Sequence, residues 1–466
     1  MAKLKLQGKD LRRIGFPEDV SLGLAIQIMH KHFKHHTVDE ALEVLKKILA
    51  SPADYLDDPY LWKIADKLAD EPEAEPDAFT LREAGCDFRI FGSGFIDDSA
   101  IAQMKIALRL PVAVSGALMP DAHHGYGLPI GGVLAGENAV IPFGVGVDIG
   151  CRMCLSIFDV PADELKNREK MLEKALLRNT IFGSGGQNRV AQDHEIIARP
   201  EFDEIPLIRN FRSKAAMQLG TSGSGNHFVE FGEIEITEGI PEKNLEPGRY
   251  IGLLSHSGSR GLGATIANHY TQVAMDMLRL PKEAQHMAWL PLDREEGQEY
   301  WAAMNLAGDY ASACHHVIHE RISREIQFAR LAMIENHHNF AWKEMINGRE
   351  LIVHRKGATP ASLGELGIIP GSMTTAGFIV RGKGEAGSIN SASHGAGRKM
   401  SRSKALQSIT RHALKEAVKS KGVTLFGGGP DEAPQAYKDI HAVMQAQKQL
   451  VDTLGCFMPK IVRMDG

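Results

Sequence analysis

The sequence predicts a mixed α/β fold for most of the chain, preceded by a small helical segment. From about residue 85, short β-prone runs alternate with glycine clusters, a pattern typical of strands joined by tight loops. Stretches with helical spacing lie between these runs, at 162–178, 310–345 and 399–421. Near the N-terminus, Thr37-Val-Asp-Glu40 matches a capping box and is followed by apolar residues at helical spacing.

We therefore expect two parts, a helical extension over 1–77 and one large domain over 78–466. The extension ends in the acidic, proline-punctuated run DEPEAEPD (Asp70 to Asp77), which is typical of a linker. It also contains MHKHFKHH (Met29 to His36), with four histidines. A metal or RNA contact is one interpretation of this run, but the pattern favours a solvated, basic helix end.

The composition narrows the class of protein. Of the 466 residues, 43% are hydrophobic and 24% charged, as in globular proteins. No apolar run approaches the length of a membrane span, and the N-terminus lacks the apolar core of a signal peptide. Five scattered cysteines suggest a reducing compartment, so we expect a cytoplasmic protein with no membrane contact. The net charge of -5 excludes a globally basic nucleic-acid binder but leaves room for a local basic groove.

The stretch from Met119 to Cys154 is the most unusual part of the chain. It combines an aspartate, two histidines, many glycines and the pair Asp148-x-x-Cys151 within 36 residues. Two β-prone runs, Leu128–Val133 and Ala139–Val147, form its middle. A hydrophobic core needs no such density of ionisable residues, so we interpret this stretch as one wall of a metal site.

Histidines in four further segments complete a ligand set. His227, His256 and His394 each stand beside glycine or serine residues that leave an imidazole accessible, and ENHHNF (Glu335 to Phe340) adds a histidine pair. With Asp148 and Cys151 they offer carboxylate, thiolate and imidazole donors, as metals need. Hydrogen-bonded structural histidines are the alternative. Because LSIFDV after Cys154 is strand-like and not the helix of a redox pair, we expect Cys151 to be a ligand and Cys154 a buried thiol.

Three weaker patterns are set aside. HHVIHE (His315 to Glu320) has metal-like spacing without the HExxH order. Gly377-FIVR-Gly382-Lys383 lacks the hydroxyl residue of a P-loop, since Gly384 follows. The terminal RMDG resembles the motif of lysine-adenylating ligases, but Arg463 stays protonated and cannot be a nucleophile.

Nine motifs in order give a more specific indication. The sequence contains PDAHHGYGLPIGG, GVDIGC, GSGNHFVE, HSGSRG, HHN, HRKGAT, PGSM, HGAGR-x-x-SR and DEAPQAYKDI. This series resembles the RtcB family of RNA-splicing ligases over roughly residues 85–466. The resemblance implies a single large RtcB-type domain with a central metal cleft. It also implies a GTP- and Mn²⁺-dependent ligase that joins an RNA 3′-phosphate or 2′,3′-cyclic phosphate to a 5′-hydroxyl.

The resemblance assigns roles residue by residue. His394 would be the nucleophile that carries GMP, and His338 is preferred over His337 because the family pairs the metal ligand with a following asparagine. The two Mn²⁺ ions would be held by Asp148, Cys151, His227, His256 and His338. The nucleotide pocket would be lined by Asn226, Glu230, Asn339, Ser372, His394, Gly395 and Gly397, and RNA phosphates would meet Arg260, Arg398 and Arg402. By softness alone this donor set suggests zinc or iron, so Mn²⁺ is implied only by the resemblance.

The chain departs from the family pattern at three positions. Arg152 follows Cys151 where glycine is usual, Gly377 replaces a nucleotide-contacting serine, and Asp465 replaces a lysine, with Lys460 and Arg463 nearby. We expect a divergent bacterial-type member that acts in RNA repair. The resemblance names an archease-like activator as a candidate partner, and the sequence does not decide whether one is needed. Two alternatives remain: a metal-dependent phosphohydrolase acting on RNA phosphates without ligation, and an RNA-binding accessory protein with a relict site.

Overall fold

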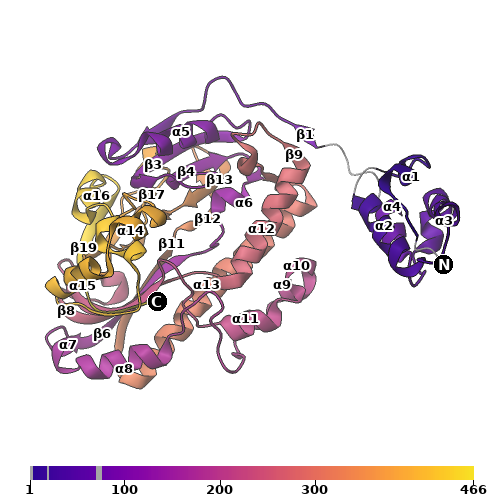
Figure 1. Ribbon diagram of the computed structural model, residues 1–466. Helices are drawn as coiled ribbons and strands as arrows, with labels where there is room; N and C mark the ends of the chain where they lie inside the picture. The colour runs from indigo at the N-terminus through magenta and orange to yellow at the C-terminus, as the bar shows by residue number, and fades with distance from the viewer. Residues whose placement is uncertain (1–3, 18–19, 70–75) are drawn as a thin grey trace. The chain divides into compact units, whose positions relative to one another are not determined.

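The computed structural model describes residues 4–17, 20–69 and 76–466, which form two compact units over 1–75 and 76–466 (Figure 1). The smaller unit is helical. Its helices are α1 (Gly8–Arg12), α2 (Val20–His32), α3 (Val38–Ala50) and α4 (Trp62–Ala69). Most of the acidic run predicted as a linker, residues 70–75, lies outside the described residues.

The capping box predicted in the smaller unit is confirmed. Thr37 Oγ1 accepts a hydrogen bond from the Glu40 backbone N–H at 3.3 Å, and Glu40 Oε2 accepts one from the Thr37 N–H at 2.7 Å. The reciprocal pair satisfies N–H groups that the first turn of α3 leaves free. Ala41, Leu45 and Ile48 then lie on one buried face of α3, so this unit has its own apolar core.

An eight-stranded sheet forms one half of the larger unit. Its order is β11-β6-β8-β7-β19-β16-β15, with β18 paired in parallel to β19 and the other pairs antiparallel. The strands are β6 (Arg152–Pro161), β7 (Phe228–Ile236), β8 (Gly248–Ser257), β11 (Arg330–His337), β15 (Leu366–Ile369), β16 (Gly377–Gly382), β18 (Thr424–Phe426) and β19 (Val451–Met464). The strand predicted after Cys154 is confirmed as part of β6.

A second, five-stranded sheet runs in the order β12-β13-β4-β3-β2. Its strands are β2 (Phe88–Ile90), β3 (Ala113–His123), β4 (Ile130–Gly136), β12 (Asn339–Ile346) and β13 (Arg349–Lys356). Three short pairs complete the strands: β1 (Asp77–Ala78) with β9 (Leu278–Arg279), β5 (Ala139–Val140) with β10 (Leu290–Pro291), and β14 (Ala358–Pro360) with β17 (Ser391–Ser393).

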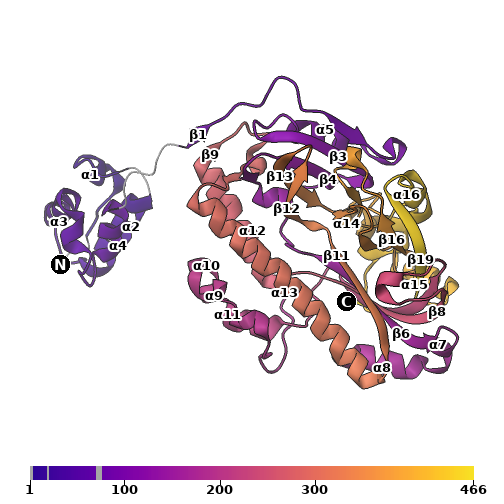
Figure 2. The same ribbon diagram turned by 180° about the vertical axis from the view of Figure 1, so that it is seen from behind.

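Two long helices, α12 (Arg260–Met277) and α13 (Glu295–Ile326), lie side by side across the larger unit (Figures 1 and 2). Shorter helices surround the sheets: α5 (Asp98–Ala107), α6 (Pro142–Val145), α7 (Glu164–Asn167), α8 (Glu169–Asn179), α9 (Glu201–Glu204), α10 (Pro206–Arg209), α11 (Arg212–Gln218), α14 (Arg402–Ser408), α15 (Arg411–Ser420) and α16 (Ile440–Ala446). The mixed α/β class predicted from the sequence is confirmed. Among the described residues, no helix combines the length and apolarity needed to cross a bilayer.

The alternation of β6 and β8 sorts their side chains onto two faces of the large sheet. Phe158, Ile251 and Leu253 pack with Ile318 and Ile322 of α13. Their neighbours Leu155, Ile157 and Leu254 belong to a separate core on the opposite face. Because successive strand residues point to opposite faces, each polar residue near the ends of these strands is assigned to one face by its position.

Three predicted elements are wrong in part. The helical stretch 310–345 ends at Ile326, where Gln327 adopts a left-handed conformation (φ 56°), and residues 330–346 form β11 and β12. The alternating burial of β11 shows the period of a strand. The stretch 399–421 is two helices, because Thr410 caps the second by accepting from the Ala413 N–H at 3.1 Å. In the β-prone run 139–147 only β5 is a strand, since Pro142 begins α6.

Arg355 on β13 should be a main determinant of the larger unit's stability. Its side chain is fully buried; it pairs with Glu344, donates to Ser391 Oγ at 2.8 Å and lies 4.7 Å from the centre of the Trp342 ring. Removing one member of such a buried pair leaves its partners unsatisfied, so Arg355→Ala should lower the free energy of unfolding by about 3–5 kcal/mol. Chemical denaturation measures this.

Arg349→Ala is the matched control on the same strand. Arg349 pairs with Glu137 at 2.7 Å, but both side chains are more than half exposed, and such pairs contribute about 0–1 kcal/mol. Equal losses in the two variants would contradict the importance of the buried pair.

Candidate functional site

The candidate metal ligands meet at one edge of the large sheet. Asp148 and Cys151 precede β6, His227 precedes β7, His256 is in β8, and His338 follows β11. The strand order brings these ends together, since His256 is in register with both Met153 of β6 and Phe228 of β7. Residues separated by more than 180 positions in the sequence therefore converge, because neighbouring antiparallel strands start or stop at the same edge.

The ligand atoms are in direct contact with one another. His227 Nε2 lies 2.9 Å from Asp148 Oδ2 and 3.6 Å from Cys151 Sγ. His256 Nε2 lies 3.2 Å from Cys151 Sγ and 3.2 Å from His338 Nε2. Cys151, His227 and His256 form a buried group whose ligand atoms all lie within 4.8 Å of one another. The structure thus brings together all five residues that the sequence singled out for metal binding.

In two of these histidines, the ring nitrogen that points away from the cluster makes a hydrogen bond that fixes the tautomer. His227 Nδ1 donates to the Ser222 carbonyl at 2.8 Å, and His256 Nδ1 donates to the Asn226 carbonyl at 3.1 Å. In the neutral ring the other nitrogen then carries a lone pair. Each Nε2 lone pair faces other ligand atoms of the cluster, so these contacts are satisfied either by a shared proton, such as that of the Cys151 thiol, or by a metal ion. Such outer N–H bonds to carbonyls are the usual support of metal-binding histidines.

Burial makes the metal the better fit. Desolvation, helped by the Asp148 charge, raises the pKa of Cys151 well above its ordinary value. Desolvation also lowers the pKa of His256 to about 3 and that of His338 far below its usual range. Neutral imidazoles and a thiol that needs a cation to ionise are suited to a metal ion. In addition, His338 Nδ1 is buried and has no hydrogen-bond partner within the described chain.

His394 lies next to this cluster and is held by a buried carboxylate. The rings of His394 and His338 are 5.0 Å apart between centres. Asp121 Oδ2 accepts hydrogen bonds from His394 Nδ1 at 2.7 Å and from the His394 backbone N–H at 3.1 Å. Burial opposes ionisation of Asp121, but the bond to His394 and its charge bring the pKa of Asp121 below its ordinary value. With Nδ1 bound to Asp121, Nε2 of His394 is the free nitrogen.

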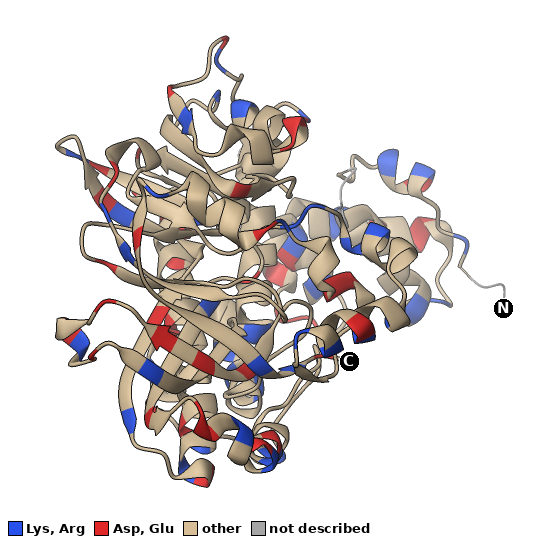
Figure 3. Cartoon of the chain, turned by 90° about the vertical axis from the view of Figure 1, so that its left-hand side faces the viewer, with Lys and Arg blue, Asp and Glu red and all other residues tan. Residues whose placement is uncertain are grey.

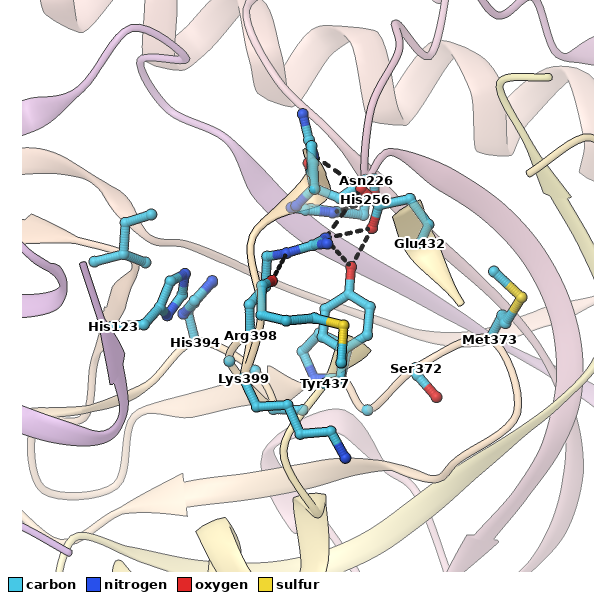
Figure 4. Close-up of a pocket in the computed structure, with 18 of the residues that line it drawn as sticks. His123, Asn226, His256, Ser372, Met373, His394, Arg398, Lys399, Glu432 and Tyr437 are labelled. Atoms are coloured by element: carbon cyan, nitrogen blue, oxygen red, sulfur yellow. Dashed lines mark hydrogen bonds and ion pairs between the residues drawn. The ribbon is translucent and has the colours of Figure 1, made fainter. Parts of the chain in front are cut away.

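A pocket of about 860 Å³ opens over the cluster, and His256, His338 and His394 form part of its wall (Figure 4). The predicted nucleotide residues Asn226, Glu230, Ser372, Gly395 and Gly397 also line it. Asn339 does not: its side chain accepts from the Gly357 N–H at 2.9 Å and lies 3.4 Å from the Asp148 carbonyl, so it braces the loop that carries Asp148.

Two of the three candidate phosphate-binding arginines face this pocket and share one carboxylate. Arg398 lies 3.3 Å from both Glu432 oxygens, and Arg402 Nε lies 3.1 Å from Glu432 Oε1. Glu432 is only 3% exposed and also accepts from Tyr437 (Figure 4). Two cations against one anion leave net positive charge at the pocket wall. Arg260 is elsewhere, with its guanidinium bound to Thr221 and to the Gly183 carbonyl.

One of the three positions that depart from the expected family pattern lies at the pocket. Gly377 lines it, and Thr375, two residues earlier, contributes a hydroxyl 2.9 Å from Ser372 Oγ. Neither basic residue near Asp465 is among the described residues that line the pocket. Arg463 donates to the carbonyls of residues 176 and 177, and Lys460 lies 3.5 Å from Glu233. Arg152 is buried and pairs with Glu335 at 3.2 Å, which makes it part of the framework behind the cluster.

Sequence reasoning did not single out Asp121 or Glu432 as site residues. Both stand inside motifs that it did identify, Asp121 in PDAHHGYGLPIGG and Glu432 in DEAPQAYKDI. The signal was an acidic residue within a motif rich in small and aromatic residues. What the sequence lacked was the pairing of each carboxylate with a side chain from a distant segment.

The fold and the cluster define a mixed α/β protein with a site prepared for metal ions. A family model described as tRNA-splicing ligase RtcB matches residues 103–464. RNA-splicing ligase RtcB1 of Escherichia coli is 34% identical over 367 residues, which cover 72% of this chain and 87% of that protein. The tRNA-splicing ligase RtcB of Thermococcus kodakarensis is 30% identical over 439 residues, covering 77% of this chain and 90% of that protein.

A third relative, the tRNA-splicing ligase RtcB of Methanococcus maripaludis, is 30% identical and covers 70% of this chain and 82% of its own length. The chain belongs to the RtcB family, as the order of its motifs predicted. Family membership and the histidine–cysteine cluster together indicate that it uses metal.

Cys151→Ala should remove metal from the cluster. The thiol is a shared neighbour of His227 and His256, so its loss breaks the donor set. We expect the Mn²⁺ content per chain after equilibration and desalting, measured by elemental mass spectrometry, to fall clearly below that of the parent protein. Cys154→Ala, which truncates another fully buried thiol on the same segment, should retain the parent content. Equal metal in both variants would contradict the assignment.

Proposed function

We propose that this protein is a GTP- and Mn²⁺-dependent RNA ligase that joins an RNA 3′-phosphate or 2′,3′-cyclic phosphate end to a 5′-hydroxyl end. His394 is the residue that becomes guanylylated. One observation above all supports this proposal: a histidine whose Nδ1 is fixed by Asp121 lines the same pocket as the donor cluster. A fixed imidazole beside a metal site is what nucleotidyl transfer requires.

The first step of the proposed reaction forms one bond and breaks one. The Nε2 lone pair of His394 attacks the α-phosphorus of GTP, the N–P bond forms, and the P–O bond to pyrophosphate breaks. The imidazole gains positive charge in this step, and the Asp121 carboxylate, 2.7 Å from Nδ1, stabilises that charge. When bound at the cluster, metal ions supply neutralisation of the charge on the transferring phosphoryl group.

Two further transfers complete the proposed cycle. An RNA 3′-phosphate oxygen takes GMP from His394, so a P–O bond forms as the N–P bond breaks. The 5′-hydroxyl then attacks the 3′-phosphorus, which forms the phosphodiester and releases GMP. A cyclic phosphate end first needs water to open it. Arg398 and Arg402 stand at the pocket wall, where guanidinium groups can grip phosphates.

Nucleobase recognition would rest on Glu230 and the Ser372 segment. Burial raises the pKa of Glu230 well above its ordinary value, so this carboxyl can donate as well as accept a hydrogen bond. Ser372 and Thr375 supply hydroxyls on the same wall. With no lysine from the C-terminal segment in the described pocket lining, guanine specificity depends on these groups.

A basic surface supports the RNA part of the proposal. Charges are intermixed along most of the chain (Figure 3), but residues 398–421 contain eight lysines and arginines and one acidic residue. Arg411, Lys415 and Lys419 of α15 line a second groove of about 960 Å³, which shares Glu432 with the nucleotide pocket. A cationic track next to the reaction site suits a phosphate backbone, even on a protein with a net charge of -5.

A second candidate function is a metal-dependent phosphohydrolase that opens cyclic phosphates and does not ligate. The same metals and arginines would serve it, and the departures from the family pattern at Gly377, which lines the pocket, and at Asp465, which does not, favour it. This second function requires the protein to turn over a 2′,3′-cyclic phosphate RNA end in the absence of GTP.

His394→Ala should abolish guanylylation while leaving metal binding intact. After incubation with GTP and Mn²⁺, intact-mass spectrometry should show one added GMP on the parent protein and none on this variant. His269→Ala on α12, which truncates an exposed imidazole, is the matched control and should label like the parent. An adduct that persists without His394 would overturn the nucleophile assignment, and no adduct on the parent would favour the hydrolase.

Reversing two charges on α15 should weaken RNA binding without affecting guanylylation. Lys415→Glu with Lys419→Glu should raise the Kd for a single-stranded RNA and reduce its salt dependence, by roughly 0.7 in log–log slope per lost phosphate contact. Lys170→Glu with Lys174→Glu is the control, an exposed pair with the same spacing on α8. Equal effects of the two pairs on RNA affinity would argue against a track along α15.

A further inference from the structure

A second group of buried histidines lies behind the metal-facing side of β8. His315 and His319 stand one turn apart on α13, and Cys154 of β6 completes a set whose ligand atoms lie within 4.8 Å of one another. All three side chains are fully buried. This set includes two of the three histidines of the HHVIHE segment, whose spacing resembles a metal motif.

Serine hydroxyls connect the two histidines in a continuous chain of hydrogen bonds. Ser156 Oγ lies 2.7 Å from His319 Nδ1, and Ser255 Oγ lies 2.7 Å from His319 Nε2 and 2.6 Å from His315 Nδ1. His315 Nε2 lies 3.2 Å from the Ser257 carbonyl. Each ring nitrogen of both histidines therefore has a partner.

The last bond of the chain fixes the direction of all the others. A carbonyl only accepts, so His315 Nε2 donates and, in the neutral ring, His315 Nδ1 must accept from the Ser255 hydroxyl. That hydroxyl has no second proton, so His319 Nε2 donates to it and His319 Nδ1 accepts from Ser156. Burial lowers the pKa of His319 to about 3 and that of His315 well below its ordinary value, which keeps both rings neutral.

This arrangement is the opposite of the metal cluster. There, the Nε2 atoms of three histidines and the Cys151 Sγ crowd together with no fixed donor for each lone pair, whereas here each ring nitrogen has a hydrogen-bond partner of defined role. A metal ion would have to displace the Ser255 hydroxyl, which already lies within 2.7 Å of both histidines. The second group is therefore a closed hydrogen-bond network.

The network ends on the groups that orient the metal ligands. Ser255 and Ser257 flank His256 in β8, and alternation places them on the α13 face and His256 on the other. Ser257 Oγ also donates to the Ser222 carbonyl at 2.9 Å. That same carbonyl accepts from His227 Nδ1 at 2.8 Å. The chain thus runs from α13 through β8 to the outer hydrogen bond of His227.

We infer that Ser255, with His315 and His319, is a positioning residue for the metal site, setting the orientation of His256 and His227 from behind. The inference rests on the proposed metal binding at that site. Outer partners of metal ligands typically contribute 10- to 100-fold in metal affinity. Because the chain reaches the ligands through β8 and Ser222, the loss of one hydroxyl should propagate to both of them.

The test is the Mn²⁺ affinity of Ser255→Ala, measured by calorimetric titration of the full chain without GTP or RNA. We expect an affinity about 10-fold or more below the parent value. Ser255→Thr keeps the hydroxyl and should rescue most of the affinity. Cys154→Ala removes a buried side chain next to these histidines but leaves their hydrogen bonds intact. This variant should bind Mn²⁺ like the parent, even if its melting temperature falls.

Two results would overturn the inference. One is parent-like Mn²⁺ affinity in Ser255→Ala, which would make the network purely structural. The other is loss of a bound metal in Cys154→Ala while His227 and His256 remain, which would make the second group a metal site. If Ser255→Ala does not fold, Ser156→Ala at the start of the chain should show a smaller loss in the same direction, and parent-like affinity there would count against the inference. A parent protein that binds no Mn²⁺ would refute the proposed function instead.

Discussion

The structure depends on the convergence of five metal-ligand side chains at one edge of the large sheet. Asp148, Cys151, His227, His256 and His338 place five ligand atoms at contact distance with fewer protons than lone pairs, an arrangement that a metal ion would stabilise. The surrounding protein must therefore hold these groups in place at a cost. It does so with carbonyls that fix two imidazoles from behind and with strands whose register leaves little freedom.

The two arginines and His394 are also held by buried acceptors. Asp121 directs His394 in the way the Ser222 carbonyl directs His227, by occupying the nitrogen that does not face the pocket. Glu432 holds Arg398 and Arg402 with a single charge, so their remaining positive charge is available to an anion. His394, Arg398 and Arg402 are thus each paired with a buried carboxylate that limits their conformations.

Residues that carry their function in local sequence were predictable, and those that depend on distant pairing were not. The five candidate metal ligands stand in glycine- and serine-rich motifs, and the structure brings them together. Asn339 fits its motif equally well, yet its amide braces a loop outside the pocket lining. The helical stretch expected over 310–345 is helical only to Ile326, because apolar residues with a period of two follow Gln327 without a proline or glycine to mark the change. In the sequence, Ser255 looks like any polar strand residue; only the packing of α13 against β8 shows its contacts with His315 and His319.

The two faces of strand β8 carry two different groups of side chains, a closed hydrogen-bond network on one face and a candidate metal ligand on the other. Its odd-numbered residues Ser255 and Ser257 belong to a layer in which every proton is assigned, while His256 between them belongs to a layer that is short of positive charge. Inserting or deleting a single residue in this strand would exchange the two sets, burying an imidazole against α13 and turning hydroxyls toward the metal. The length of β8 is therefore as constrained as its composition. Single-residue insertions should be tolerated in the loop before β8 but not within the strand.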